Sequence, residues 1–350
     1  MKRLQTVLPT KRILLRPILL PLLLFTLIAG CQPITRNAAT PPSHSASESG
    51  QVAANGITLA YESFGATDRE TILLIAGTGM QLVDWPMELI DALVQRGYRV
   101  VRFDNRDIGL STHLDEAGLP DSDAIGKALQ AGQPAPLAYT LHDMAADAVG
   151  LLDALQIQQA HLVGISMGGA IAQLMAIDYP EHVLSLTLLM SDSGNPQQPV
   201  IANPDSFADV PPQPTTVDME SYIDWQVKTW QALSGPDYPT DEATLRQWAE
   251  RDFARGYDPA GFARQGAAIV VDRYEASGYR HNHLTEIKTP TLVLQGTSDP
   301  IVPMDAATEL AASVPGAELR QVPGLGHDSP PELVPLFVDV ISATAERSAK

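Results

Sequence analysis

Two hydrophobic patterns alternate along the chain from residue 56 onward. Short apolar runs such as 71–76 and 160–165 have the length and composition of strands that are covered on both faces of a sheet. The segment 140–155 instead places its apolar residues on one stripe at helical spacing. Strands that alternate with helices predict an α/β fold with a mainly parallel sheet and helices on both faces. Further strands are expected at 56–65, 99–103, 185–190, 290–295 and 317–322, and further helices at 86–96, 168–178, 304–313 and from about 331.

Residues 195–285 interrupt this alternation. The segment opens with Pro-rich stretches and continues with helical patterns around 218–234, 241–256 and 259–277. An all-helical insert between two sheet strands predicts a cap over one edge of the sheet. We therefore expect one globular domain at 55–348, with its cap at about 195–285.

The first 54 residues have a different texture. A basic stretch precedes an apolar run at 13–29, which ends at Ala29, Gly30 and Cys31. This order is typical of a secretion signal. The stretch 32–54 is rich in Ser, Ala, Pro and Thr, a composition that cannot bury enough surface to fold. We expect a signal peptide at 1–30 and a flexible tether at 31–54.

The end of the apolar run, L-I-A-G-C at 27–31, resembles the lipobox of bacterial lipoproteins. The resemblance implies lipidation of Cys31, cleavage before it, export, and a lipid anchor in the cell envelope. Gln32 follows the cysteine, and the resemblance implies that the absence of Asp at this position favours the outer membrane in a host that has one. The alternative is an uncleaved membrane anchor in which Cys31 is incidental.

Charge and cysteine content exclude several classes of function. The net charge is −18, so the chain lacks the basic surface that nucleic-acid binding needs. The same acidity argues against electrostatic docking on anionic lipid, so membrane attachment must come from the anchor. With Cys31 as the single cysteine, an internal disulfide, a cysteine-based zinc site and a cysteine nucleophile in the globular part are excluded.

The motif G-I-S-M-G at 164–168 lies directly between a predicted strand and a predicted helix. That context is the one a nucleophile elbow requires. The turn is so tight that a side chain at 164 or 168 would clash, and glycine removes the clash. Ser166 then projects at the top of the sheet, beside a helix N-terminus that favours developing negative charge. Ser166 is the predicted nucleophile.

A serine hydroxyl needs a general base and an acid that orients the base. Around such an elbow the chain order is Ser, then acid, then His. Among the eight histidines, His327, after the last predicted strand, satisfies this order. Asp299 follows the strand at 290–295 and is the favoured acid. Asp192, after the strand at 185–190, is the alternative, and otherwise a loop-capping residue.

Acyl transfer also needs an oxyanion hole. One donor should be the backbone N–H of Met167, the residue after the nucleophile. The other should come from the loop that follows the strand at 71–76. Thr78 is favoured for this role and Gly77 is the alternative, since the glycines of A-G-T-G-M let the loop approach a substrate closely.

Residues 56–345 resemble the α/β-hydrolase superfamily along nearly their whole length. The stretch R-F-D-N-R-D-I-G-L-S-T at 102–112 is similar to a loop of that superfamily at Asp104, Arg106, Gly109 and Ser111, where a bracing role is expected. Together with A-G-T-G and G-I-S-M-G, it resembles the aclacinomycin methylesterase branch, which cleaves a methyl ester on a polyketide.

The resemblance implies a serine hydrolase that acts on a small-molecule carboxylic ester through an acyl-enzyme. Neither a metal nor an organic cofactor is expected. Other chemistries of this fold stay open: lactone, thioester or amide hydrolysis, carbon–carbon cleavage and haloperoxidation. A non-catalytic binding lipoprotein on the same fold is the alternative from a different class.

Overall fold

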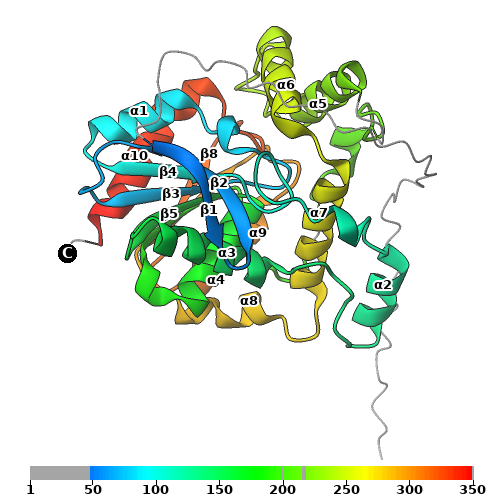
Figure 1. The fold of residues 1–350 in the computed structure, drawn as a ribbon, viewed down its shortest axis with the longest axis horizontal. Helices are drawn as coiled ribbons and strands as arrows, with labels where there is room; N and C mark the ends of the chain where they lie inside the picture. Colours follow the sequence, from blue (N-terminus) through cyan, green and yellow to red (C-terminus); the bar gives the residue numbers. More distant parts are fainter. Residues whose placement is uncertain (1–47, 199–200, 215–217, 349–350) are drawn as a thin grey trace, which may run out of the picture. The chain divides into compact units, whose positions relative to one another are not determined.

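The computed structural model describes residues 48–198, 201–214 and 218–348. Within them, strands form one sheet in the order β1-β2-β4-β3-β5-β6-β7-β8 (Figure 1). β2 pairs antiparallel with β1 and β4, and the pairings from β4 to β8 are parallel. The strands are β1 (Glu48–Ala54), β2 (Ile57–Phe64), β3 (Thr71–Ile75), β4 (Arg99–Phe103), β5 (Ala160–Ile165), β6 (Val183–Leu189), β7 (Thr291–Gly296) and β8 (Glu318–Val322).

Helices cover both faces of the sheet, as the sequence predicts (Figure 1). α1 (Met87–Gln95) and α10 (Val334–Glu346) pack on one face. α3 (Leu141–Ala154), α4 (Met167–Asp178) and α9 (Met304–Ser313) pack on the other. Short 3-10 helices lie at η1 (Leu82–Asp84), η2 (Asp115–Ala117), η3 (Pro180–His182), η4 (Pro204–Phe207), η5 (Leu284–Glu286) and η6 (Pro331–Leu333).

Strand β3 shows why a central strand is an unbroken apolar run. Leu73 and Ile75 point into the core beneath α3 and α4, whereas Ile72 and Leu74 point into the core beneath α1 and α10. All four side chains are fully buried. Burial of each contributes about 1.5–3 kcal/mol, so both faces of the strand select large apolar residues.

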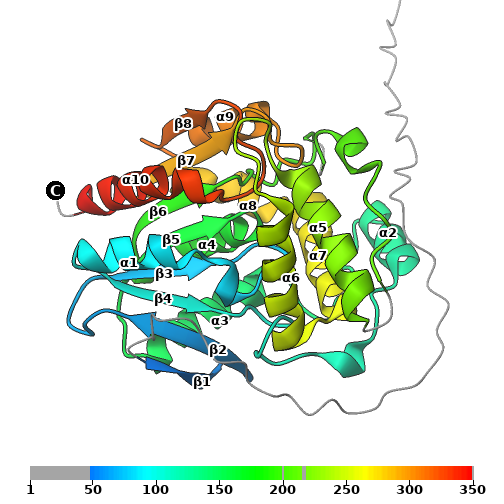
Figure 2. The ribbon, with the colours of Figure 1, turned by 90° about the horizontal axis from the view of Figure 1, so that it is seen from above.

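The predicted cap is helical and lies between β6 and β7. It consists of α5 (Met219–Leu233), α6 (Glu242–Gly256), α7 (Pro259–Tyr274) and α8 (Tyr279–His283), and Figure 2 shows α5, α6 and α7 side by side at one end of the sheet. α5 and α6 share a small core of their own, while α7 packs on α2 (Ser122–Gln130) and α3, and α8 returns to α4.

The tether predicted for 31–54 is wrong for its last seven residues, which form β1. β1 is a mostly exposed edge strand, so it lacks the apolar face that would mark it in the sequence. Its signal is the pair Asn55 and Gly56, both with positive φ, which makes a two-residue hairpin turn into β2. The lipid attachment at Cys31 and the signal peptide at 1–30 lie outside the described residues. No helix among the described residues is both long and apolar enough to cross a membrane.

Candidate active site

Ser166 lies in a sharp turn between β5 and α4, with φ 54° and ψ −120°. A Cβ on Gly168 would lie 2.0 Å from the carbonyl oxygen of Ile75, and one on Gly164 would lie 2.2 Å from the carbonyl oxygen of Gly168. A side chain at either position would therefore clash with the backbone, so both positions require glycine. The strained turn is held by its neighbours, since the N–H of Ser166 donates to the Leu189 carbonyl at 2.9 Å.

Three predicted residues meet at the carboxyl ends of different strands. His327 Nε2 lies 2.9 Å from Ser166 Oγ, and His327 Nδ1 lies 2.8 Å from Asp299 Oδ2. The Asp299 side chain is fully buried and that of His327 nearly so, while Ser166 is half-buried. Ser166 follows β5, Asp299 follows β7 and His327 follows β8, so the parallel sheet brings together residues far apart in the sequence.

The carboxylate of Asp299 is fixed on all sides. Oδ1 accepts hydrogen bonds from the backbone N–H groups of Ile301 and Val302, at 2.8 and 2.9 Å. Oδ2 accepts from Gln295 Nε2 at 2.8 Å and faces His327. Gln295 is a buried residue of β7 that the sequence analysis missed. Its signal is an amide inside an otherwise apolar strand, four residues before the acid.

Asp192, the alternative acid, is engaged elsewhere. Its carboxylate pairs with Arg273 and Arg280 and accepts a hydrogen bond from the N–H of Gly194 at 2.7 Å. Burial opposes the charged form, but the two guanidinium groups outweigh it and hold the pKa of Asp192 below its usual value. The acid that contacts His327 is Asp299.

The loop after β3 runs beside the nucleophile. A Cβ on Gly77 would lie 3.3 Å from Ser166 Cβ. The N–H of Gly79 is already donated to Gln265 Oε1 at 2.9 Å and that of Met80 to the Gly77 carbonyl at 3.3 Å, so Gly77 and Thr78 are the candidate donors that remain in this loop. Met167 is the first residue of α4, and N–H groups in the first turn of a helix have no partner inside the helix.

The sequence pattern of the alpha/beta hydrolase fold family matches residues 70–332. The chain belongs to this family. The serine hydrolase activity and the fold predicted from the sequence are thereby confirmed.

The named relatives of this alpha/beta hydrolase act on different substrates. It is 30% identical over 292 residues to the rhodomycin D methylesterase DnrP of Streptomyces peucetius, across 78% of this chain and 90% of the relative. It is 28% identical over 273 residues to a 2-hydroxy-6-oxononadienedioate/2-hydroxy-6-oxononatrienedioate hydrolase of Paraburkholderia phymatum, across 76% and 83%. The enol-lactonase structure from Burkholderia xenovorans superposes with a TM-score of 0.64 at 23% identity, across 84% and 99%, which shows the shared fold.

The stretch 102–112 of this hydrolase braces the site, and it also anchors the cap. Buried Asp104 accepts hydrogen bonds from the N–H groups of Leu82 and Leu110, at 2.7 and 2.9 Å. It also forms an ion pair at 3.0 Å with Arg255 of α6. Arg106 pairs at 2.6 Å with Asp147 of α3. The links to the cap were not predicted, because nothing near Asp104 in the sequence shows which cation it meets.

Asp107, His113 and Asp258 each bring one possible metal ligand atom within 4.8 Å of the others. Arg264 of α7 donates to both carboxylates, at 2.7 Å to Asp107 and 3.3 Å to Asp258. His113 Nδ1 lies 2.9 Å from Asp258. A protein cation therefore already pairs with both acids, and the group links the loop after β4 to the cap.

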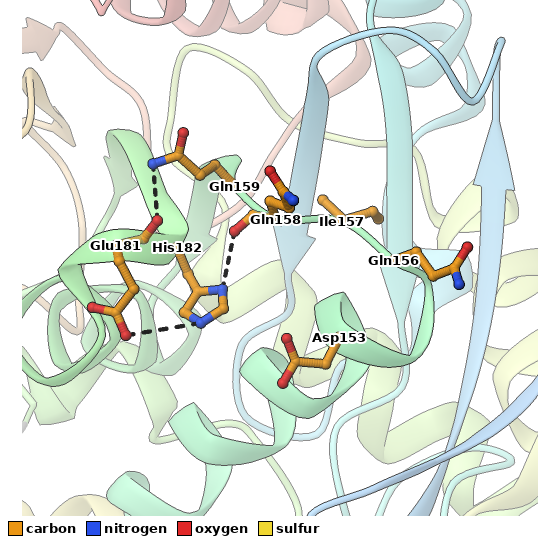
Figure 3. Close-up of a pocket in the computed structure, with 7 residues that line it drawn as sticks. All are labelled: Asp153, Gln156, Ile157, Gln158, Gln159, Glu181 and His182. Atoms are coloured by element: carbon orange, nitrogen blue, oxygen red, sulfur yellow. Dashed lines mark hydrogen bonds and ion pairs between the residues drawn. The ribbon is translucent and has the colours of Figure 1, made fainter.

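The surface hollow drawn in Figure 3 does not belong to the active site. It has a volume of about 460 Å³ and is lined mostly by polar residues, among them Asp153, Gln159, Glu181 and His182. Gln159 directly precedes β5, whereas Ser166 directly follows it. The hollow therefore lies at the opposite end of the strand from the nucleophile.

Proposed function

We propose that the protein hydrolyses a small-molecule carboxylic ester, with Ser166 as nucleophile, His327 as general base and Asp299 as the acid that orients the base. The observation that carries the proposal is the continuous hydrogen-bonded chain from Ser166 Oγ through the imidazole to Asp299. The methylesterase relative at 30% identity supports an ester substrate.

The first half of the reaction forms an acyl-enzyme. Ser166 Oγ attacks the ester carbonyl while His327 Nε2 takes its proton. Asp299 stabilises the imidazolium, and four donors hold its two oxygens in place. The N–H groups of Met167 and Thr78 stabilise the oxyanion. Thr78 is partly exposed whereas Gly77 is buried, which favours Thr78 as the donor that a substrate can reach.

The second half releases the acid. His327 donates its proton to the leaving alcohol, and the ester C–O bond breaks. Water then gives a proton to His327 and attacks the acyl carbonyl, and the oxyanion collapses to free Ser166, which recovers its proton from His327. Every group that takes part in these reaction steps belongs to the protein, the substrate or water.

The test compares the full chain with Ser166→Ala and a control, Ser206→Ala, whose serine lies in the cap at η4. Substrates are p-nitrophenyl esters of increasing chain length, with a fluorophosphonate probe in parallel. Wild type and control should turn over esters and be labelled, and Ser166→Ala should lose at least about 10³-fold in kcat and all labelling.

Each other outcome has a defined meaning. Absence of both turnover and labelling in the wild type would refute an activated serine and favour a binding protein on this fold. Labelling without ester turnover would refute the ester assignment and direct the search to lactones, thioesters, amides and carbon–carbon bonds.

We also propose that the chain is exported and anchored in the cell envelope through lipid on Cys31, in the outer membrane of a host that has one. Support comes from the lipobox resemblance at 27–31 and from Gln32. Each buried CH₂ of an acyl chain contributes about 0.8 kcal/mol, so two chains suffice for a durable anchor. Mass spectrometry should find a diacylglyceryl thioether on Cys31, and Cys31→Ser should lose it. An unmodified Cys31 preceded by residues 1–30 would refute the proposal.

A further inference from the structure

The end of cap helix α5 lies directly against the loop that carries His327. The N–H of His327 donates to the carbonyl oxygen of Leu233, the last residue of α5, at 2.8 Å. A Cβ on Gly326 would lie 2.1 Å from that same oxygen, and one on Gly235 would lie 2.0 Å from the carbonyl oxygen of Gly324. The two backbones therefore touch, and only glycine fits at these positions.

A second contact joins the same two segments through side chains. Ser234 Oγ lies 2.7 Å from Asp328 Oδ2 and 3.0 Å from the Trp230 carbonyl oxygen. One hydroxyl has one hydrogen to donate, so it cannot serve both acceptors at once. Either an Asp328 carboxylate accepts that hydrogen, or a neutral Asp328 donates its own proton to Ser234 Oγ while Ser234 donates to Trp230. The Trp230 carbonyl keeps the N–H of Ser234 at 2.9 Å in both cases.

The surroundings of Asp328 place its ionisation near neutral pH. Burial is the main cause that raises the pKa of Asp328 to about 6. The hydrogen bond from Ser234 and the charge of His327 lower this pKa, and the charge of Asp299 raises it. Asp328 Oδ1 is buried and has no partner among the described residues, so the charged form is costly. Asp237 adds a further carboxylate from the cap, close to Gly324 of the same loop.

We propose that Asp328 is a positioning residue for His327, and that its bond to Ser234 couples the cap to the charge beside the imidazole. The proposal rests on the assignment of His327 as the general base. When Asp328 ionises, its proton passes to solvent and the Ser234 hydroxyl turns from Trp230 to Oδ2. The resulting carboxylate, one residue from His327, stabilises the imidazolium that forms as Ser166 attacks. A displacement of α5 that breaks the Ser234 bond makes this charge harder to form.

The kinetic test uses the full chain as wild type, Asp328→Asn, Ser234→Ala and the double variant. Asp328→Asn should lower kcat about three- to tenfold above pH 7 with KM little changed, because one nearby charge is lost and no substrate contact is. The acid limb of its pH profile should lack the inflection near pH 6. Ser234→Ala should move that inflection to higher pH, and the double variant should match Asp328→Asn.

Thr229→Ala is the matched control. Its hydroxyl donates to the Trp225 carbonyl at 2.8 Å within α5, the same kind of bond without contact to the His327 loop. It should leave the pH profile unchanged. An Asp328→Asn profile identical to wild type would overturn the proposal, and so would additive effects of Asp328→Asn and Ser234→Ala, since Ser234 then acts by another route.

An NMR titration separates failure of this proposal from failure of the proposed function, because it needs no turnover. The carboxyl carbon of Asp328, assigned by its loss in Asp328→Asn, should titrate near pH 6 in wild type and higher in Ser234→Ala. In wild type, the His327 ring signals should shift with the same midpoint as the Asp328 carboxyl carbon. In Asp328→Asn this shift should be absent. Unchanged midpoints or unresponsive ring signals would overturn the coupling. Absence of fluorophosphonate labelling in wild type would instead refute the proposed function.

Discussion

Gln265 Oε1, on cap helix α7, accepts a hydrogen bond at 2.9 Å from the backbone N–H of Gly79, in the loop after β3. The same side chain is fully buried, and its Nε2 donates to the carbonyl oxygen of Arg106 at 2.9 Å. One amide of the cap therefore fixes two loops at the carboxyl ends of neighbouring strands. The first of these loops contains Thr78, the proposed oxyanion donor.

We expect Gln265→Leu to lower kcat about 10- to 100-fold with a smaller change in KM, because a displaced loop misaligns the Thr78 donor in the transition state. Gln265→Glu retains an acceptor for Gly79 but not the donor to Arg106. Its kcat should therefore lie between that of the leucine variant and that of the wild type. Steady-state kinetics and the affinity for a boronic acid test this. Equal boronic acid affinity in all three proteins would contradict the role of Gln265.

Substitution of the two candidate acids should have different effects, one on activity and the other on stability. Asp299→Asn should lower kcat by about 10³- to 10⁴-fold with modest loss of stability, because an amide cannot stabilise the imidazolium. Asp192→Asn should cost about 3–5 kcal/mol in the free energy of unfolding, because buried Arg273 then lacks its counter-charge, while Arg280 keeps its ion pair with Asp272. Ester turnover and urea unfolding are measured on both. Reversed phenotypes would identify Asp192 as the catalytic acid.

Gly168→Ala should abolish folding or activity, because its Cβ would lie 2.0 Å from the backbone oxygen of Ile75. Gly266→Ala is the matched control in α7, where an added Cβ meets nothing within 4 Å. The control should gain up to about 1 kcal/mol from helix propensity. Circular dichroism melts compare the two, and a soluble, active Gly168→Ala would show that the elbow relaxes more than its packing suggests.

The folding stability should depend on the ionisation of Asp328. Its pKa is about 6 in the folded protein against a usual 3.8, so the folded state retains a proton that the unfolded chain has released. Stability is therefore lost as pH rises from about 4 through 6, by up to about 3 kcal/mol. Asp328→Asn cannot ionise and should lack this loss. Urea unfolding at pH 4 and 7.5 measures the free energy of unfolding of both proteins. If the difference in this free energy between wild type and Asp328→Asn were the same at both pH values, the prediction would be wrong.

The alternating order of elements and the reactive serine could be predicted from sequence because both depend on local patterns. A strand buried on both faces must be apolar along its length, and a strand–turn–helix elbow needs glycine on both sides of Ser166. His327 and Asp299 followed from their places after the last strands. β1 could not be predicted in the same way, since an exposed edge strand carries no hydrophobic stripe and its turn at Asn55 and Gly56 is its one local mark.

By itself, then, the sequence determined the sheet of alternating elements, the helical insert and the order of serine, acid and histidine. The tertiary structure decided which partners meet. It placed Asp299 rather than Asp192 on the imidazole and Gln295 behind Asp299. It joined Gln265 to Gly79 and Ser234 to Asp328. These are single polar contacts between distant segments, and neither periodicity nor a local motif carries information about which cap residue meets which loop.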